Sequence, residues 1–309
     1  MKEKLISWGR LLRLPNLFTV PGDPLVGFLV VTEGQVDVVL GKKLILVMLS
    51  AIFVYLYGLV SNDIADLDED TRDRPKRPLP SGAVALSTAK IAAAVFVVVA
   101  LALAYGAGLH AFVFALILVV LVSFYNFSFK SHLVFGPLLL GLCRISSILL
   151  GAAAVSGAEV NVQPLYFVLP TVFFYIYGVS EVAKSETETL SHRRGRAPMC
   201  VAVLIVLLTV MFFGFILFNI PQGAAVDSTS IIVGILLYLF FAGITFKYVV
   251  LFTRQQQPAV IQRSIGALIR NLMFFQAAWC AFSGSPIIAA IIVLLSYNAK
   301  IASKKFYGS

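Results

Sequence analysis

The sequence contains few charged residues: Asp, Glu, Lys and Arg make up 13% of its 309 residues, whereas 60% are hydrophobic. In a typical soluble domain the charged share is about 25%. Its mean hydropathy of +0.94 points the same way. So little polar surface cannot cover an apolar core in water, which excludes a soluble globule. The sequence therefore predicts an integral membrane protein.

Cysteine and histidine are also scarce, with three residues of each type. The cysteines lie inside apolar runs and show neither metal-ligand nor redox spacing, which favours buried thiols over disulfides or zinc ligands. The histidines are scattered along the chain, so we assign no histidine as a general base. These residues are Cys143, Cys200, Cys280, His110, His132 and His192.

Low-complexity tracts, soluble appendages and short repeats are absent, so we expect a single domain over residues 1–309. The first fifteen residues have basic side chains and Trp8 but no long apolar core followed by a cleavage site. This pattern predicts an interfacial helix over residues 1–15 and no removable signal.

Long apolar runs make up most of the sequence, and most of them are long enough to cross a hydrocarbon core of about 30 Å. They predict an all-α, polytopic bundle of nine or ten transmembrane helices. The runs cover residues 16–33, 44–61, 88–108, 111–129, 134–155, 164–182, 198–220, 231–252, 260–282 and 285–302. Polar residues make 260–282 either a span or an interfacial helix. These are Gln262, Arg263, Arg270, Asn271 and Gln276.

The net charge of +9 raises the alternative of a nucleic-acid binder. When the runs are threaded alternately, nearly all Lys and Arg fall with the termini in linkers on one side, at residues 62–87, 130–133, 183–197 and 253–259. The positive-inside rule makes that side cytoplasmic, and the membrane is then the cytoplasmic (inner) one. Topology and contacts with anionic lipids account for the charge, so no nucleic acid is required.

An acidic motif ends the second run, where six acids occur between residues 63 and 73. On an ideal helix Asn62, Asp63, Asp66 and Asp70 share one face within about 100°, whereas Asp68 lies about 160° from Asp66. Clustered carboxylates near hydrocarbon need a cation. Short oxygen ligands suit Mg²⁺, which binds few carboxylates together with phosphate groups of a substrate.

A basic, proline-rich segment follows at once and contains Arg72, Arg74, Lys76 and Arg77. Guanidinium groups bind phosphate oxygens, and the prolines stiffen the loop that presents them. The two segments together predict a metal–diphosphate site. The alternative is a solvated charge run beside the membrane, which would require neither the shared face nor the position at a span end.

The pattern NDxxDxxxD followed by RPxRPxPSG resembles the first signature of the UbiA superfamily of intramembrane prenyltransferases. The resemblance implies Mg²⁺-dependent transfer of a prenyl group from a polyprenyl diphosphate to an acceptor. It also implies that Asn62, Asp63, Asp66 and Asp70 are the catalytic, metal-holding residues. Within the superfamily, LLRLPNLFTVPGDPLVGFL and GPLLLGLCR look most like the EboC-like branch.

The resemblance also implies a second acidic motif, and the matching stretch here begins at Tyr177. Glutamates stand where the superfamily has aspartates, and on a continuing helix Glu181 and Glu188 share a face with Ser185 and His192 within about 60°. They are the predicted ligands of a second metal ion. Alternatively, these acids pair with neighbouring cations, namely Lys184, Arg193, Arg194 and Arg196.

Other polar residues inside or at the ends of runs are candidates for substrate binding. Arg144 lies deep in a run and needs a carboxylate or diphosphate partner. The Tyr125-x4-Lys130 spacing resembles the part of the family fold that faces the diphosphate, although Lys130 could equally extend to the cytoplasmic interface. Asp23 is predicted to satisfy a broken helix. The full predicted substrate-binding set is Asn16, Arg72, Arg74, Arg77, Tyr125, Lys130, Arg144 and Lys184.

Two rival functions remain at this point. Because the second motif diverges, the chain could be a lipid-diphosphate binder or an accessory protein of a membrane biosynthetic pathway. Intramembrane charges also occur in transporters, although no inverted repeat is evident. The preferred hypothesis is a prenyltransferase whose partners are a prenyl diphosphate, an acceptor and membrane lipids. The sequence identifies neither the acceptor nor the oligomeric state.

Overall fold

A computed structural model describes residues 2–155, 160–184, 227–254 and 257–307, and every regular element in these ranges is helical. The first half contains α1 (Lys2–Leu11), η1 (Leu14–Thr19), α2 (Gly22–Thr32), α3 (Val38–Ala65), α4 (Leu67–Asp73), α5 (Leu86–Ala107), α6 (Leu109–Phe124) and η2 (Tyr125–Phe129). The second half contains α7 (Phe135–Ala152), α8 (Leu165–Lys184), α10 (Ser228–Arg254), α11 (Pro258–Phe282) and α12 (Pro286–Tyr307).

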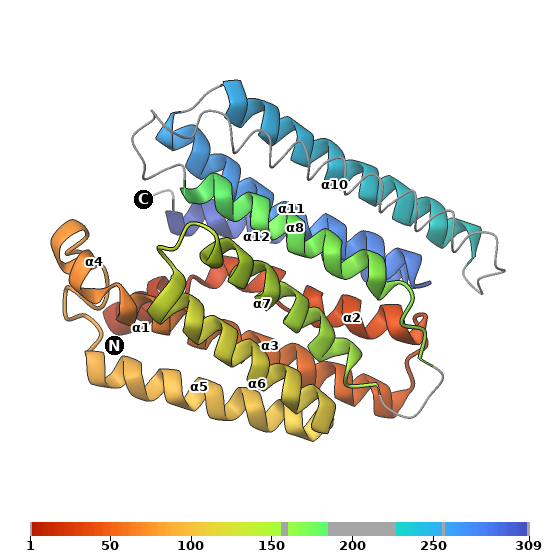
Figure 1. Cartoon of the computed structure of the whole chain (residues 1–309), viewed down its shortest axis with the longest axis horizontal. Coiled ribbons are helices and arrows are strands. Elements are labelled where there is room, and N and C mark those ends of the chain that lie inside the picture. Colours follow the sequence, from red (N-terminus) through yellow and green to blue (C-terminus); the bar gives the residue numbers. More distant parts are fainter. Residues whose placement is uncertain (1, 156–159, 185–226, 255–256, 308–309) are drawn as a thin grey trace.

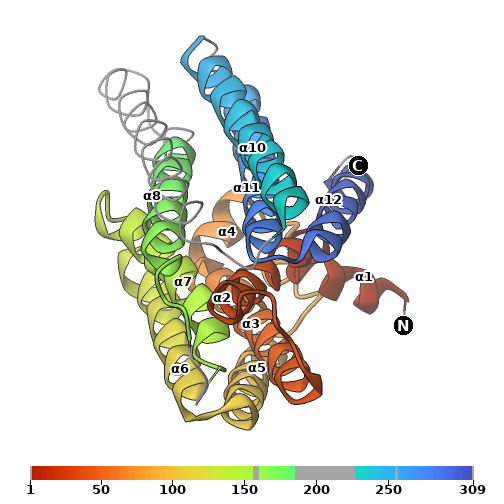
Figure 2. The same ribbon diagram turned by 90° about the vertical axis from the view of Figure 1, so that its right-hand side faces the viewer.

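The long helices run roughly alongside one another (Figure 1). Viewed near their axes, α2 lies at the centre of the bundle with the other helices around it, and its residues from Gly22 to Val31 are buried (Figure 2). Helix α3 packs on α5, α2 on α7, and α11 on α10 and α12. Helix α4, helix α1 and the C-terminal end of α12 lie at the same end of the bundle (Figure 1). This agrees with the threading that puts the termini and the acidic motif on one side.

Local sequence signals end α2 and begin α3 in the connection between these two helices. Glu33 ends α2 in the left-handed conformation with φ of 50°, and Gly34 follows with φ of 73°. Asp37 then caps α3, because its carboxylate accepts a hydrogen bond from the Leu40 amide at 2.7 Å. A compact connection therefore reverses the chain between two spans.

Seven of the described helices are long and apolar enough to cross a membrane, and two shorter apolar segments, Leu17–Thr32 and Pro286–Asn298, accompany them. Large aliphatic side chains are exposed along outer faces, such as Ile91, Val95 and Val98 on α5. Exposed apolar stripes are unusual in soluble proteins and natural against lipid. The predicted all-α polytopic bundle is confirmed, and the run over 198–220 lies outside the described residues.

Helix α11 resolves the two alternatives for residues 260–282. Asn271 is 1% exposed and donates from Nδ2 to the Phe241 carbonyl and to Thr245 Oγ1, each at 2.9 Å. Gln276 is fully buried, whereas Gln262 and Arg263 are exposed near the start of the helix. Asn271 and Gln276 therefore face the interior of the bundle, where their hydrogen bonds join helices. Because Val260–Phe282 is also long and apolar enough to cross a membrane, the structure favours a span over an interfacial helix.

Helices α2 and α7 approach each other closely through two glycines. A methyl group on Gly27 would overlap the Ile148 carbonyl, and one on Gly151 would overlap the Pro24 carbonyl. Small residues permit such backbone contact in membrane bundles, where dispersion forces replace the hydrophobic drive between helices. This contact fixes α7 against the first span.

We expect Gly151→Ala to lower the free energy of unfolding by about 1–3 kcal/mol, because backbone atoms must move apart to make room. Gly243→Ala in α10 is the matched control, since no atom of another described segment lies within 4 Å of the added methyl group. Thermal unfolding of both variants in detergent measures the difference. Equal midpoints would contradict the close contact between α2 and α7.

Candidate functional site

The acidic motif lies at the junction of two helices. Helix α3 ends at Ala65, Asp66 has φ of −88° and ψ of 4°, and α4 begins at Leu67. The expectation of one continuous helix is therefore wrong. Backbone hydrogen bonds still link residues four apart, from the Asp66 amide to the Asn62 carbonyl at 3.0 Å and from the Asp70 amide to the Asp66 carbonyl at 2.8 Å. These bonds keep Asn62, Asp66 and Asp70 aligned across the junction.

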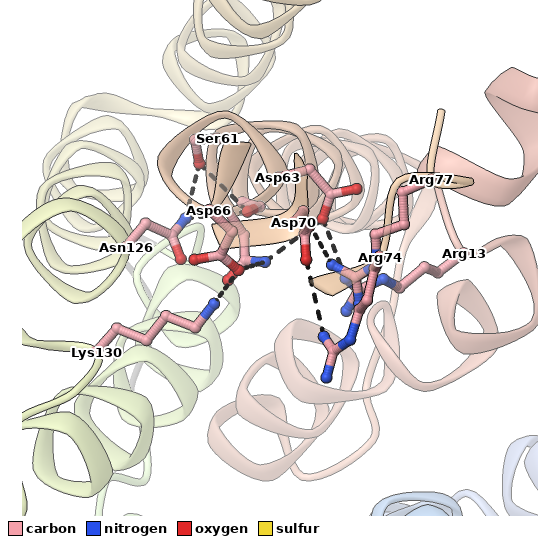
Figure 3. Close-up of polar contacts among 11 residues, drawn as sticks. Arg13, Ser61, Asp63, Asp66, Asp70, Arg74, Arg77, Asn126 and Lys130 are labelled. Carbon is pink, nitrogen blue, oxygen red and sulfur yellow. Dashed lines mark hydrogen bonds and ion pairs between the residues drawn. The ribbon is translucent and has the colours of Figure 1, made fainter. Parts of the chain in front are cut away.

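Each of the three predicted carboxylates pairs with a cation that comes from another part of the chain or from the basic loop (Figure 3). Asp63 Oδ1 lies 3.1 Å from Arg13 Nη2, and Asp66 pairs with Lys130. Asp70 pairs with Arg77 at 2.5 Å and more distantly with Arg74 at 3.9 Å. The cluster therefore joins the N-terminal segment, α3, α4, the basic loop and the residue that follows η2.

Asn62 connects two of these carboxylates. Its Nδ2 lies 3.4 Å from Asp63 Oδ1 and 3.2 Å from Asp66 Oδ2. Asp63 and Asp70 are 6% and 2% exposed, whereas Asp68 and Glu69 are exposed. Burial thus separates the acids into a clustered set and a solvent-facing set, as the helical geometry predicts for Asp68.

The basic loop is held over the cluster by its own turns and by an apolar base. The Ser81 amide donates to the Arg77 carbonyl and the Val84 amide to the Pro78 carbonyl, both at 3.0 Å. Leu79 and Val84 are buried in a small apolar cluster together with Leu11 and Val60. The loop and α1 are therefore fastened to the same part of α3, which brings the guanidinium groups of Arg13 and Arg77 to neighbouring carboxylates.

Lys130 and Tyr125 come from the end of the α6–η2 segment. Lys130 pairs with Asp66, and Tyr125 is half-buried and close enough to Asp66 for an electrostatic interaction. Both predicted residues therefore lie beside the acidic motif, as their spacing suggested.

Arg144 pairs with a carboxylate that does not belong to the acidic motif. Its Nη1 donates to Asp23 Oδ2 at 2.8 Å, and Gln276 Nε2 donates to Asp23 Oδ1 at 2.8 Å and to the Thr19 carbonyl at 3.0 Å. Asp23 is 2% exposed. Asp23 therefore joins α2 to α7 and α11, a structural role that differs from the predicted one of satisfying a broken helix.

Two of the other predicted residues, Arg72 and Glu181, are described and do not pair with the cluster. Arg72 is exposed and, within the described ranges, its side chain has no hydrogen-bond or ion-pair partner. Glu181, near the end of α8, has a buried Oε1 with no hydrogen-bond partner among the described residues. The side chains of Asn16 and Lys184 lie outside the description, and Glu188 lies outside the described residues altogether. The roles predicted for these five residues stay predictions.

Among the described residues, no three acid, histidine or cysteine side chains gather closely enough to enclose a metal ion by themselves. The carboxylates are drawn toward their cations instead. Sequence reasoning missed Arg13 in this set, since fifty positions separate it from Asp63. No spacing rule links such distant residues, although a basic residue directly before the LPN sequence was a usable signal.

A family model described as the UbiA prenyltransferase family matches residues 24–275. The chain belongs to the UbiA prenyltransferase family. The narrower resemblance to the EboC-like branch stays a prediction. The match covers α2 to α11 and therefore includes the acidic cluster, apart from Arg13.

Two curated relatives of this UbiA-family chain are digeranylgeranylglyceryl phosphate synthases. The one from Methanocaldococcus jannaschii is 38% identical over 88 residues, which are 28% of this chain and 30% of that protein. The one from Sulfurisphaera tokodaii is 26% identical over 224 residues, which are 68% of this chain and 80% of that protein. The first similarity is thus local and the second extends over most of both chains.

Solved structures support the UbiA fold. A structure of digeranylgeranylglyceryl phosphate synthase has a TM-score of 0.67 at 21% identity and covers 91% of this chain and 99% of that one. A UbiA homologue from Archaeoglobus fulgidus, solved with GPP and Mg²⁺, has a TM-score of 0.59 at 16% identity, with 95% and 99% covered. At these identities the likeness shows the arrangement of helices alone.

We expect Arg144→Met to lower the free energy of unfolding by about 3–5 kcal/mol, because it leaves Asp23 buried without its cation. Adding Asp23→Asn to Arg144→Met should recover most of this loss, since the charge disappears and an amide oxygen still accepts from Gln276. Thermal unfolding of the wild type, the single variant and the double variant measures both effects. A double variant no more stable than Arg144→Met would show that the ion pair is not the cause.

Proposed function

We propose that this UbiA-family chain is a Mg²⁺-dependent intramembrane prenyltransferase that transfers a prenyl group from a polyprenyl diphosphate to an acceptor. One observation carries the proposal: three carboxylates and four cations meet in one cluster at the end of a membrane bundle. Such a cluster is suited to a metal–diphosphate headgroup, while the apolar helices beneath it are suited to an isoprenoid tail.

The charges of this cluster match the proposed ligand. Three aspartates against Arg13, Arg74, Arg77 and Lys130 leave one net positive charge. An ionised alkyl diphosphate carries up to about three negative charges, so one Mg²⁺ would bring the assembly to neutrality. Neutrality matters here because an uncompensated charge next to hydrocarbon is costly.

The donor set fits Mg²⁺. Its ligands would be the carboxylate oxygens of Asp63 and Asp66 with the amide oxygen of Asn62, all hard donors. The Asn62 amide nitrogen already lies within 3.4 Å of both carboxylates, so the two acids face a common point. Three convergent acids are not required, because Mg²⁺ commonly binds one or two carboxylates and completes its shell with water and phosphate oxygens.

The cations of the cluster are proposed to bind the diphosphate. As the bond between the allylic carbon and the diphosphate oxygen breaks, negative charge grows on the leaving group, and Arg77, Arg13 and Lys130 would stabilise it. Bound Mg²⁺ would add positive charge to the same oxygens. The aspartates hold and orient in this account and do not transfer protons. The acceptor nucleophile then captures the allylic carbon, and the proton that a hydroxyl acceptor loses passes to the released diphosphate.

The acceptor class is proposed from the relatives, whose names describe products built on glyceryl phosphate. A glyceryl phosphate lipid with a free hydroxyl group is therefore the first acceptor to test. We further propose that the acidic cluster faces the cytoplasm, because basic linkers accompany it on that side.

The direct test incubates purified protein in lipid vesicles with Mg²⁺, a radiolabelled prenyl diphosphate and a geranylgeranylglyceryl phosphate or a total lipid extract. Labelled lipid product supports the proposal. Saturable binding of the diphosphate without any product would instead support a binding or accessory role, and diphosphate-independent flux of a solute through the vesicles would support a transporter.

We expect Asp66→Asn to reduce prenyl transfer by about 100-fold or more, because it removes a proposed metal ligand and the partner of Lys130. Asp68→Asn is the matched control, since it makes the same chemical change on an exposed carboxylate two residues away. Initial rates at saturating Mg²⁺ measure the difference. If the two variants lose activity equally, general charge and not the clustered face is responsible.

We expect Arg13→Met to weaken binding of the prenyl diphosphate by about tenfold, the loss typical of one charge-assisted hydrogen bond. Arg10→Met, an exposed position in the last turn of α1, is the control for the change in charge. Isothermal titration of both variants with the diphosphate and Mg²⁺ provides the dissociation constants. Unchanged affinity in Arg13→Met would remove this residue from the proposed diphosphate site.

A further inference from the structure

The end of the fourth predicted span contains a local departure from α-helical geometry. Residues Tyr125–Phe129 form a π-helical turn, η2, between α6 and Lys130. Such turns are rare, occur mostly as single turns within α-helices, and are frequent at functional sites. Tyr125 begins this turn, and Lys130, which directly follows it, pairs with Asp66.

The π-helical turn decides on which side of the helix Lys130 lies. In an uninterrupted α-helix Tyr125 and Lys130 would point about 140° apart around the axis. A π-helical turn pairs backbone groups five residues apart and so places two such residues one above the other. The turn therefore brings Lys130 onto the side of the helix on which Tyr125 lies, and Lys130 pairs with Asp66 there.

Asn126 anchors this turn to α3. Its Nδ2 donates to the Gly58 carbonyl at 3.0 Å and to Ser61 Oγ at 2.7 Å, and the residue is 7% exposed. The carbonyl can only accept, so it defines which end of the Asn126 amide faces α3. A Cβ on Gly58 would lie 3.2 Å from Val122, so the glycine lets α6 come close enough for these bonds.

We propose that Asn126 is a positioning residue for the diphosphate site. By holding η2 against Gly58 and Ser61 it directs Lys130 toward Asp66 (Figure 3). It does not itself touch the ligand. The inference rests on the proposed function, since it assumes that the Asp66 region receives the diphosphate.

A second hydrogen bond across the same pair of helices provides a control. Tyr57 on α3 and Ser123 on α6 are joined by their hydroxyl groups at 2.6 Å, just before η2. Removing this bond weakens the contact between α3 and α6 in the same way but leaves the anchor of the π-helical turn intact. A purely structural role for Asn126 therefore predicts that Ser123→Ala and Asn126→Ala behave alike.

The test is a double-mutant cycle on ligand affinity, with geranyl S-thiolodiphosphate as a non-reacting probe. The wild type, Asn126→Ala, Lys130→Met and the double variant are titrated in detergent at saturating Mg²⁺, and thermal midpoints are recorded in parallel. We expect Lys130→Met to weaken binding about tenfold and Asn126→Ala about three- to tenfold. The double variant should bind no more weakly than Lys130→Met, because Asn126 acts through Lys130. Ser123→Ala should bind like the wild type.

Other results would overturn the inference. Effects of Asn126→Ala and Lys130→Met that multiply in the double variant would show that the two residues act independently. An Asn126→Ala affinity equal to that of the wild type would show that Asn126 has no role in binding. If Asn126→Ala does not fold, Ser61→Ala removes one of its two acceptors, and it must weaken binding in the wild type but not in Lys130→Met. A wild-type protein that fails to bind the probe would refute the proposed function, whereas normal binding with an uncoupled cycle refutes the positioning role alone.

Discussion

Pairing of charges at the membrane boundary is the constraint on which the site depends. Carboxylates at the end of a span are costly unless cations neutralise them, and the fold supplies those cations from separate segments. Arg13 comes from the N-terminal segment, Arg77 from the loop after α4, and Lys130 from the end of η2. The same pairings tie these segments to α3, to Asp66 and to α4, so the charges that suit a ligand also organise the mouth of the bundle.

A second pair of opposite charges has a different role deeper in the bundle. Asp23 and Arg144 are bonded to each other, and Gln276 adds a third helix to the network. Their partners are already internal, so nothing in this pair requires a ligand. The contrast separates the two acidic regions: the mouth of the bundle has an excess of cations, whereas the interior pair is balanced.

Family membership and local geometry support the proposed function in different ways. The match to the UbiA prenyltransferase family covers most of the chain and makes prenyl transfer the first reaction to propose. The geometry adds particular residues, including two for which the sequence predicted no role, Arg13 and Asn126. The region of the second acidic motif contributes less, because only Glu181 among its predicted metal ligands lies in the described part of the chain.

Composition and periodicity were enough to predict the membrane bundle, its spans and the acidic face, because each depends on residues close together in the chain. The shared face of Asn62, Asp66 and Asp70 is an example, since hydrogen bonds four residues apart preserve it even across the break at Asp66. Other features needed the tertiary structure. The partners of Asp63 and Arg144, the inward face of α11 and the π-helical turn before Lys130 all depend on contacts between distant segments. The physical reason is that a charged or amide side chain can satisfy its need for a partner in many ways, and only the packing of the helices selects one.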